Sequence, residues 1–334
     1  MTGQLRDSYD VVVIGGGAAG LSGALMLARS RRSVLVIDAG TPRNAPATAV
    51  HGLLARDGMP PAELLDRGRA EVRGYGGQLT AGQVSTVRQD QDGFTVTLAG
   101  GRPVRPGPVR PGPVRPGPVR PGTVHARRLL VATGLADELP DIPGLRERWG
   151  RDVVHCPYCH GWEVRDQAIG VLASGPTAVH QALLFRQLSD DVVLFSHTMP
   201  EPEGEEARQL AALGVRVVPG EVVSLEIADD RLTGVRLADG RVLARQALAV
   251  APRMTARAGF LADLGLKPTA HPLGVGEYIP AGPAGRTEVP GVWVAGNVTD
   301  LGAQVGGAAA AGALAGAAIN MDLVAEDAGR AAAA

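Results

Sequence analysis

The stretch YDVVVIGGGAAG, residues 9–20, predicts a buried strand that ends at Ile14 and runs into glycines at GxGxxG spacing. A helical pattern over residues 21–30 and a second apolar strand over residues 33–37, which ends at Asp38, follow directly. Strand, glycine turn, helix and second strand form a βαβ unit of the kind that binds dinucleotides. The sequence therefore predicts an α/β fold whose first element is a nucleotide site.

Each glycine of this turn has a separate physical role. Gly15 permits the tight turn, Gly17 lets the backbone approach a pyrophosphate, and Gly20 lets the helix pack on the strand. The helix begins near Ala18 and Ala19, where free N–H groups and the helix dipole favour phosphate. An acid at the end of the second strand, here Asp38, can bond a ribose hydroxyl. A glycine turn without a ligand is the alternative, and the complete context argues against it.

Composition limits the remaining classes of function. The 334 residues suffice for about two domains, and 45% hydrophobic with 20% charged residues is typical of a globular protein. A net charge of -1 argues against a polycation that coats nucleic acid or anionic lipid. No secretory signal is visible, and the longest apolar run, residues 305–319, is too short to span a bilayer. We therefore expect a cytoplasmic protein without a membrane or nucleic-acid partner.

A low-complexity block interrupts the first half of the chain. The pentapeptide PVRPG occurs four times between residues 103 and 122. Proline prevents sheet pairing and glycine disfavours helix, so we expect polyproline II or disorder in an inserted surface arm. Two interpretations remain open for it. The arm is a tolerated repeat expansion, or its four arginines form a site for an anionic partner.

A second α/β unit follows this block. We expect a strand over residues 168–172, a turn over 173–178, a helix over 179–188 and a strand over 191–195. Late in the chain, a strand at 292–295 precedes a Gly/Ala-rich helix from about 303 to 324. The predicted domain division is therefore discontinuous. Residues 1–138 and 253–334 form an FAD-binding domain, and residues 139–252 form an inserted domain of the NAD(P)-binding type.

Two further motifs support a family resemblance. Ala132-Thr133-Gly134 ends a central strand, and GVWVAGNVTD occupies residues 291–300. Together with the first glycine turn, they make the chain resemble the flavoprotein disulfide reductases with two dinucleotide-binding (three-layer ββα) domains. The resemblance covers nearly the whole chain outside residues 103–122. It implies FAD as the cofactor.

The late motif carries a departure from that family. The resemblance implies an acid at the strand end that binds the ribityl chain, and this sequence has Asn297 there, after Gly296, with Asp300 three residues on. An asparagine can still hydrogen-bond a hydroxyl. The helix that follows Gln304 and Val305 would direct its N-terminus at the flavin, where its dipole stabilises negative charge.

The two cysteines identify the subfamily. Cys156 and Cys159 form a CxxC motif after the central ATG, at the entrance to the second domain. This arrangement resembles the low-molecular-weight thioredoxin reductases. Two intervening residues let the sulfurs close a disulfide with little backbone movement. A zinc site would need two more ligands, and His155 and His160 are too close in sequence to complete a tetrahedron, so we predict no metal.

The neighbours of the cysteines refine the resemblance. In ordinary thioredoxin reductases an acid follows the second cysteine, and here His160 does, an imidazole able to accept a thiol proton. His155 is either a second proton-transfer group or a solvated residue at a strand end. The motif HCPYCHGWE, with DAGTPRN at residues 38–44, is similar to the dithiol oxidases of disulfide natural-product pathways, of the holomycin and gliotoxin type. The resemblance implies a homodimer through the FAD domains, and further cofactor contacts from Ala39, Arg43, Asn44 and His51.

The second glycine turn is incomplete. Ala173 replaces its first glycine, and an alanine that needed a positive φ would be strained. Residues 196–200 contain no arginine for a 2′-phosphate, and Glu201, Glu203, Glu205 and Glu206 follow. We therefore predict that NADPH is not a proper substrate.

Three functions are consistent with these residues. The first is an FAD-dependent dithiol oxidase, in which a small-molecule dithiol reduces the Cys156–Cys159 disulfide and O2 is the final acceptor. In it Cys156 faces substrate, Cys159 faces the flavin, and His160 is the base, with His155 as a second candidate. The alternative is a reductase of the thioredoxin-reductase type that takes electrons from NADPH. A flavin-bearing redox sensor is the third, and the intact CxxC argues against it.

Overall fold

The computed structural model describes residues 5–100 and 122–334. The predicted arm at residues 103–122 lies outside the described residues, apart from Gly122. Its two ends are side by side, because Thr97 pairs with Thr123 and the Leu98 N–H donates to the Gly122 carbonyl at 3.2 Å. A short turn could therefore join the two strands. The role of the arm remains a prediction.

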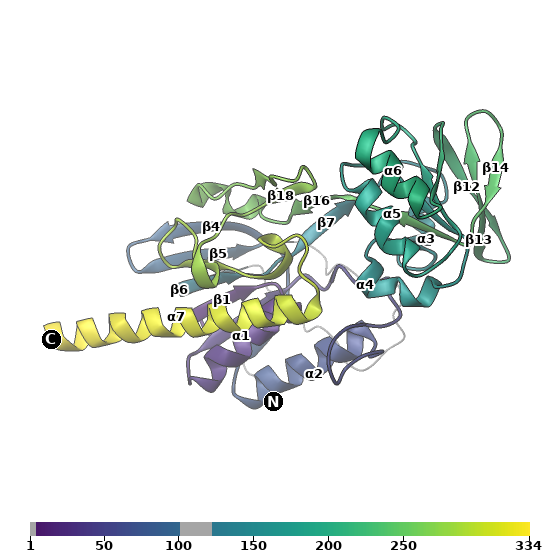
Figure 1. Cartoon of the computed structure of the whole chain (residues 1–334). Coiled ribbons are helices and arrows are strands. Elements are labelled where there is room, and N and C mark those ends of the chain that lie inside the picture. The colour runs from purple at the N-terminus through teal and green to yellow at the C-terminus, as the bar shows by residue number, and fades with distance from the viewer. Residues whose placement is uncertain (1–4, 101–121) are drawn as a thin grey trace.

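A seven-stranded sheet forms the core of the larger part of the molecule (Figure 1). Its strand order is β3-β2-β1-β6-β5-β4, and β19 pairs with β6. The predicted βαβ unit is at its centre, where β1 pairs in parallel with both β2 and β6. The strands are β1 (Ser8–Ile14), β2 (Val34–Asp38), β3 (Gln78–Ala81), β4 (Val84–Asp90), β5 (Gly93–Leu98), β6 (Thr123–Val131) and β19 (Val292–Val294).

Helices cover one face of this sheet, and on the other face the strands β4 and β5 and the short helix η2 (Gly259–Leu264) share a buried cluster with β1 and β2. On the helical side, apolar residues of α1 and α7 share a buried cluster with β1 and β2. A small four-stranded sheet has the order β17-β18-β16-β7. The elements are α1 (Ala18–Arg29), α2 (Pro61–Gly74), α7 (Val305–Ala333), β7 (Leu135–Glu138), β16 (Arg253–Ala256), β17 (Thr269–Ala270), β18 (Gly276–Tyr278), η2 (Gly259–Leu264), η3 (Pro283–Gly285) and η4 (Gly296–Val298).

The smaller part repeats the three-layer plan. A five-stranded parallel sheet, β11-β10-β9-β15-β8, lies between helices and the antiparallel sheet β12-β13-β14. Its elements are α3 (Leu145–Arg148), β8 (Val153–Val154), α4 (Pro157–His160), η1 (Trp162–Val164), β9 (Ile169–Leu172), α5 (Ala178–Arg186), β10 (Val192–Phe195), α6 (Gly204–Ala212), β11 (Arg216–Val218), β12 (Val222–Ala228), β13 (Arg231–Leu237), β14 (Val242–Ala244) and β15 (Ala247–Val250). The predicted α/β class with parallel-sheet cores is confirmed.

The chain passes between the two parts twice, through neighbouring strands. β7 leaves the larger part and β16 returns to it, and the two pair antiparallel from Arg253–Glu138 to Ala256–Leu135. Arg253 also forms an ion pair with Glu277 at 2.6 Å. These two crossings coincide with the junctions predicted near residues 139 and 252. The division into domains at these points remains our proposal.

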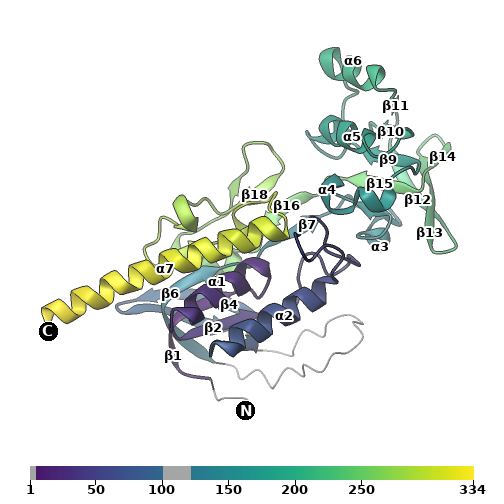
Figure 2. The same ribbon diagram turned by 60° about the horizontal axis from the view of Figure 1, so that its bottom comes forward.

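Helix α7 is longer than the sequence pattern predicted. It runs from Val305 to Ala333, because alanines continue the helix beyond residue 324. Among the described residues it is the one helix long and apolar enough to cross a membrane by length and composition. Its inner face packs on α1, and a Cβ on Gly312 would lie 1.9 Å from the Ala19 carbonyl oxygen. The far end of α7 projects beyond the sheet (Figure 2).

Candidate active site

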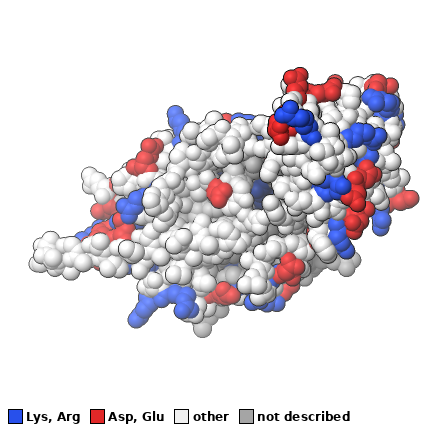
Figure 3. Space-filling model, in the orientation of Figure 1, with Lys and Arg blue, Asp and Glu red and all other residues white. Residues whose placement is uncertain are grey.

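A cavity of about 830 Å³ extends from the glycine turn of β1 to the cysteine pair of the smaller part. Its size is in the range of cofactor pockets. Figure 3 shows the hollow between the two parts, with mostly uncharged surface around it. Nearly all predicted site residues line it: Gly15, Gly17, Ala18, Ala19, Asp38, Ala39, Arg43, Asn44, His51, Ala132, Thr133, Gly134, His155, Cys156, Cys159, His160, Gly296, Asn297, Gln304 and Val305. Gly20 and Asp300 do not.

The geometry of the glycine turn agrees with the predicted division of roles. Gly15 has φ +107°, and a Cβ there would lie 2.3 Å from the Ala132 carbonyl oxygen. A Cβ on Gly20 would lie 1.9 Å from the Gly15 carbonyl oxygen, so this glycine serves packing. Gly17 is different, because nothing lies within 4 Å of its Cβ position. Backbone atoms therefore fill the space beside Gly15 and Gly20. The space beside Gly17, the residue before α1, is open and faces the cavity.

Asp38 lies beside this turn at the end of β2. Its Oδ1 accepts the Gly40 N–H at 3.2 Å, and its Oδ2 pairs with Arg69 Nη2 at 3.2 Å. Asp38 lines the cavity, and its contact with a ribose hydroxyl stays a prediction. Arg69 comes from α2 and was not identified from the sequence. The ion pair with Arg69 holds the Asp38 carboxylate in position.

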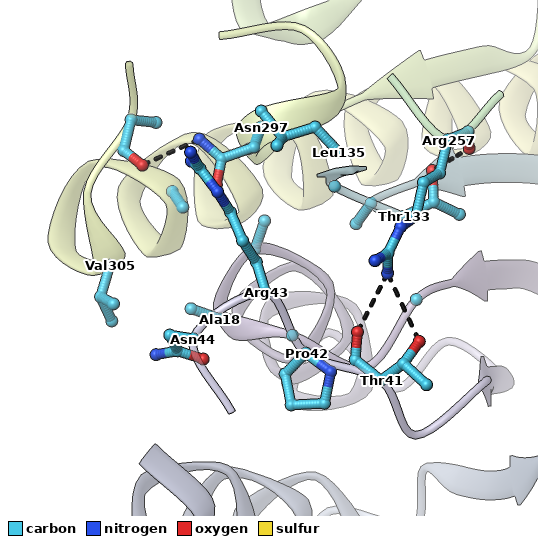
Figure 4. A pocket seen from close by; sticks show the side chains of 18 of the residues that line it. Ala18, Thr41, Pro42, Arg43, Asn44, Thr133, Leu135, Arg257, Asn297 and Val305 are labelled. Carbon is cyan, nitrogen blue, oxygen red and sulfur yellow. Dashed lines mark hydrogen bonds between the residues drawn. The ribbon is translucent and has the colours of Figure 1, made fainter. Parts of the chain in front are cut away.

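The central ATG motif, residues 132–134, also lines the cavity, and Arg257 contacts it (Figure 4). Thr133 Oγ1 donates to the Arg257 carbonyl at 2.7 Å, and the Arg257 N–H donates to the Gly134 carbonyl at 3.0 Å. The Arg257 guanidinium donates to the Thr41 carbonyl at 3.0 Å. This arginine therefore fixes the loop after β2 against the ATG turn, and no sequence motif indicated it.

The structure explains the asparagine at the late motif. Asn297 Nδ2 donates to the Asp300 and Ala303 carbonyls, each at 2.9 Å, and these bonds hold the loop before α7. A carboxylate in this position would have no hydrogen to donate. The Asn297 Oδ1 is the atom left to accept a hydroxyl. Asp300 was predicted as a cofactor contact, but it does not line the cavity. Its Oδ1 instead accepts the Gly302 N–H at 3.0 Å within the loop.

Arg43 contacts both crossing strands rather than standing free in the cavity. Its Nε and Nη2 donate to the two Asp137 carboxylate oxygens of β7 at 2.8 and 2.7 Å. Its Nη2 also lies 3.5 Å from Met254 Sδ of β16. The positive charge of the guanidinium still acts on the cysteines: it helps to lower the pKa of Cys156 and partly opposes the rise in the pKa of Cys159. The sequence identified Arg43 and missed Asp137.

The cysteines are a reduced pair at the cavity wall. Cys156 precedes α4 and Cys159 lies within it, and Cys159 Sγ donates to Cys156 Sγ at 2.7 Å. That hydrogen bond is the main reason that the pKa of Cys156 falls to about 7; backbone N–H groups and Arg43 also lower it, against the effect of burial. The pKa of Cys159 is raised by the same bond and by burial. Cys156 is therefore the thiolate of the pair.

Both predicted histidines line the cavity with the thiols. Burial and then Arg43 lower the pKa of His155, while its Nδ1 lies 3.1 Å from the Val250 carbonyl. Since a carbonyl only accepts, Nδ1 carries the hydrogen and Nε2 is free to accept a proton. Burial also lowers the pKa of His160, against a raising effect of Glu163. Both imidazoles are neutral at pH 7, as a base requires.

The second glycine turn differs from its prediction in one respect. Ala173 is buried and does not adopt a positive φ, so the expected strain is absent. Ser174 Oγ instead donates to the Ala251 carbonyl at 2.8 Å. Pro176 faces the larger part, because a Cβ on Gly274 would lie 3.7 Å from Pro176 Cγ. His197, with φ +53°, accepts the Val222 N–H at 3.1 Å where a 2′-phosphate would need a cation.

A parallel sheet with an open glycine turn and a CxxC motif facing the same cavity define a flavoprotein disulfide oxidoreductase. The cavity fits FAD, since Gly17 leaves room for a pyrophosphate and Asp38 and Asn297 offer acceptors for hydroxyls. The chain matches the family of pyridine nucleotide-disulphide oxidoreductases over residues 9–317, and it belongs to that family. It is an oxidoreductase whose cofactor is FAD.

Similar proteins match most or nearly all of the chain. Thioredoxin reductase sirT of Leptosphaeria maculans is 30% identical over 336 residues, with 96% of this chain and 95% of that protein covered. Thioredoxin reductase tcpT of Claviceps purpurea is 31% identical over 299 residues, with 86% of each covered. The crystal structure of HlmI is 46% identical, with a TM-score of 0.86 over 99% of this chain and 98% of that one. The resemblance to thioredoxin-reductase-like flavoproteins is confirmed.

Proposed function

We propose that the protein is an FAD-dependent dithiol oxidase that closes a disulfide in a small-molecule dithiol, with O2 as acceptor. The observation that carries the proposal is the pairing of a reactive thiol with neutral imidazoles in one cavity. The Cys156 pKa of about 7 and the buried His155 and His160 suit a site that takes protons from an incoming dithiol. Bound FAD supplies the two-electron chemistry that couples the cysteines to dioxygen.

The two cysteines have different roles in this proposal. A substrate thiolate attacks Cys156 of the enzyme disulfide, and the Cys159 thiolate leaves. The second substrate thiol then displaces Cys156 from the mixed disulfide, which leaves an oxidised substrate and a reduced enzyme pair. The hydrogen bond from Cys159 to Cys156 in that reduced pair stabilises the Cys156 thiolate. The histidines hold the protons that the two substrate thiols lose.

Two exposed aromatic side chains lie close to the cysteines in the sequence. Tyr158, between the two cysteines, and Trp162, three residues after Cys159, are 68% and 66% exposed. The Arg165 guanidinium lies over the Trp162 ring at 4.1 Å, so one face of this ring carries a cation. Exposed aromatic side chains beside a reactive centre are typical of ligand contact.

The second glycine turn supports dioxygen rather than NADPH as the partner of the flavin. Pro176 and the Gly274 loop approach each other where a pyrophosphate would need access. Where a 2′-phosphate would be expected to bind, the sequence has His197 and no arginine. Glu205 and Glu206 follow in the first turn of α6. Both features disfavour a phosphorylated dinucleotide.

A thioredoxin-reductase-type activity is the second candidate. The names of the similar fungal proteins favour it, since both are called thioredoxin reductases. In that activity electrons would enter from NAD(P)H and leave through Cys156 to a disulfide. It uses the same cavity and the same cysteines, so only the direction of electron flow separates the two.

The direct test is oxygen consumption by the purified holoenzyme with a small dithiol and without NADPH. We expect one hydrogen peroxide for each disulfide formed. Cys156→Ser and Cys159→Ser should each abolish the reaction, and His160→Ala should slow it about 100-fold. His155→Ala compares the second candidate base. Reduction of thioredoxin by NADPH, without dithiol oxidation, would contradict the proposal.

A further inference from the structure

One polar side chain lies on the buried face of helix α5. The buried residues of this helix have the spacing of a single face, and they are Ala178, Gln181, Ala182 and Phe185. Gln181 is 6% exposed, and among the described residues its Oε1 has no hydrogen-bond partner. An unpaired buried acceptor lowers stability, so an apolar residue would serve packing better at this position. The glutamine therefore needs another explanation.

The amide of Gln181 binds the peptide group that joins a candidate base to the first cysteine. Its Nε2 donates to the His155 carbonyl at 2.7 Å. That carbonyl belongs to the peptide bond between His155 and Cys156, the residue directly before α4. Since only the NH2 end of an amide can donate, this bond also fixes which way the Gln181 amide points. Gln181 thus holds the backbone that carries both the imidazole and the thiol.

Strand β15 holds the imidazole ring of His155. β8 and β15 pair in parallel, with Val154 opposite Ala249, and His155 and Val250 come next in the two segments. His155 Nδ1 lies 3.1 Å from the Val250 carbonyl, so Nδ1 carries the hydrogen and Nε2 keeps a lone pair. His155 lines the cavity, and burial and then Arg43 lower its pKa, so the ring is neutral at pH 7.

The other candidate base is held less firmly. His160 also lines the cavity, but its ring makes no hydrogen bond to any of the residues that the structure describes. The ring of His155 is fixed by the Val250 carbonyl, and its backbone is fixed by Gln181. A general base is effective when its lone pair is held in one orientation toward the reacting group. The geometry therefore favours His155 as an oriented base.

We propose that Gln181 is a positioning residue that orients His155 to accept a proton from one thiol of the substrate. This inference rests on the proposed function. The dithiol loses two electrons and two protons as its disulfide forms, and His155 Nε2 takes one of those protons. Dioxygen takes up both electrons and both protons when it becomes H2O2. His155 is therefore neutral again at the end of each cycle.

A hydrogen bond that only completes the pairing of a strand end is the competing explanation. Such a bond would contribute to stability and leave the imidazole unaffected. Gln181→Met removes the amide and keeps the length of the side chain. Ser189→Ala is the matched control, because Ser189 is 5% exposed in the same part, its Oγ donates to the Gln167 carbonyl at 2.5 Å, and it does not line the cavity.

A double-mutant cycle in dithiol oxidation tests the coupling. His155→Ala should lower kcat about 100-fold, as expected for the loss of a general base. Gln181→Met should lower kcat about tenfold, because the imidazole loses its fixed orientation. The variant with both substitutions should be no slower than His155→Ala, since Gln181 acts through His155. Ser189→Ala should leave kcat unchanged, with or without His155.

NMR of 15N-histidine-labelled holoenzyme examines the ring without turnover. The resonances of His155 are assigned by their loss in His155→Ala. In the wild-type protein they should report one tautomer, with the hydrogen on Nδ1. Gln181→Met should give a mixture of the two tautomers, and Ser189→Ala should match the wild type.

An unchanged His155 tautomer in Gln181→Met, or a loss of kcat from that substitution that persists in His155→Ala, would overturn the proposal. If the holoenzyme oxidises no dithiol but the tautomer mixture forms in Gln181→Met, the proposed function fails and the positioning of His155 stands. If Gln181→Met does not fold, Gln181→Asn takes its place, because its amide is one methylene too short to reach the carbonyl. The same two results then decide.

Discussion

Cys156 and Cys159 share a motif but not a reactivity. The Cys159 thiol donates to Cys156 Sγ, which stabilises the thiolate of Cys156 and lowers its pKa to about 7. In reduced protein, alkylation at Cys156 should therefore rise about tenfold per pH unit below pH 7 and level off above it. Cys159, whose pKa is raised, should react far more slowly. Mass-spectrometric mapping of iodoacetamide adducts measures both, and equal reactivity of the two thiols would contradict the assignment.

Gly17 gives the sharpest test of the cofactor site. Its Cβ position is free of protein atoms, so Gly17→Val should fold and lose FAD, because the side chain fills the space of the pyrophosphate. Gly175→Val is the matched control, since Gly175 is equally unobstructed in the second turn. That variant should stay yellow. Flavin absorbance per protein after gel filtration checks both, and full FAD content in Gly17→Val would rule the site out.

Two residues show what sequence patterns could not supply. Asn297 was identified as a ligand in place of an acid, but its donation to two carbonyls depends on a loop that the sequence does not describe. Ala173 was expected to be strained, yet the turn avoids a positive φ there. In both cases the role of the residue depends on the conformation of the local backbone, which the residue type alone does not predict.

At the scale of secondary-structure elements, the contact between α1 and α7 depends on two glycines of α7. Gly312 lies against the Ala19 carbonyl, and Gly316 lies against the Gly23 carbonyl, where a Cβ would be at 2.6 Å. Gly312→Val should cost about 3 kcal/mol of unfolding free energy and reduce FAD retention, since α7 begins at the cavity. Gly329→Ala, at an open helical position, should leave that energy unchanged or raise it by up to about 1 kcal/mol. Urea denaturation compares them, and equal midpoints would contradict this packing account.

Elements with strong local patterns were predictable, and contacts between distant segments were not. The strands β1 and β2, the helix α1 and the position of the CxxC follow from periodicity and glycine spacing. The Arg257–Thr41 and Arg43–Asp137 contacts join residues far apart in sequence and have no local signature. Helix α7 was predicted too short, because an alanine run without a stop signal does not mark its own end.

At the scale of the whole molecule, α7 carries an apolar stripe that nothing in the described residues covers. Its outward positions alternate three and four residues apart, the spacing of a coiled-coil seam. Leu314, Met321 and Val324 are 61%, 72% and 52% exposed. The full stripe is Gly307, Ala310, Leu314, Ala317, Met321, Val324 and Ala328. We expect a second copy of the chain to pack here, which agrees with the homodimer expected through the larger part.

A charge in this stripe should separate the two copies. Leu314→Glu with Met321→Glu should convert a dimer to a monomer, because two carboxylates would be buried at each helix contact. FAD content should stay near the wild-type level, since both side chains point away from the cavity. Sedimentation equilibrium at micromolar concentration measures the mass. A wild-type monomer, or a dimer that survives both substitutions, would contradict this interface.

The central claim is that electrons enter from a dithiol and not from NADPH. Anaerobic mixing tests it without oxygen chemistry, by following flavin absorbance after oxidised holoenzyme meets either reductant. We predict that a small dithiol bleaches the flavin within the turnover time, that Cys156→Ser prevents this, and that NADPH leaves the flavin oxidised. Rapid bleaching by NADPH, with the dithiol inactive, would contradict the account and establish the reductase in its place.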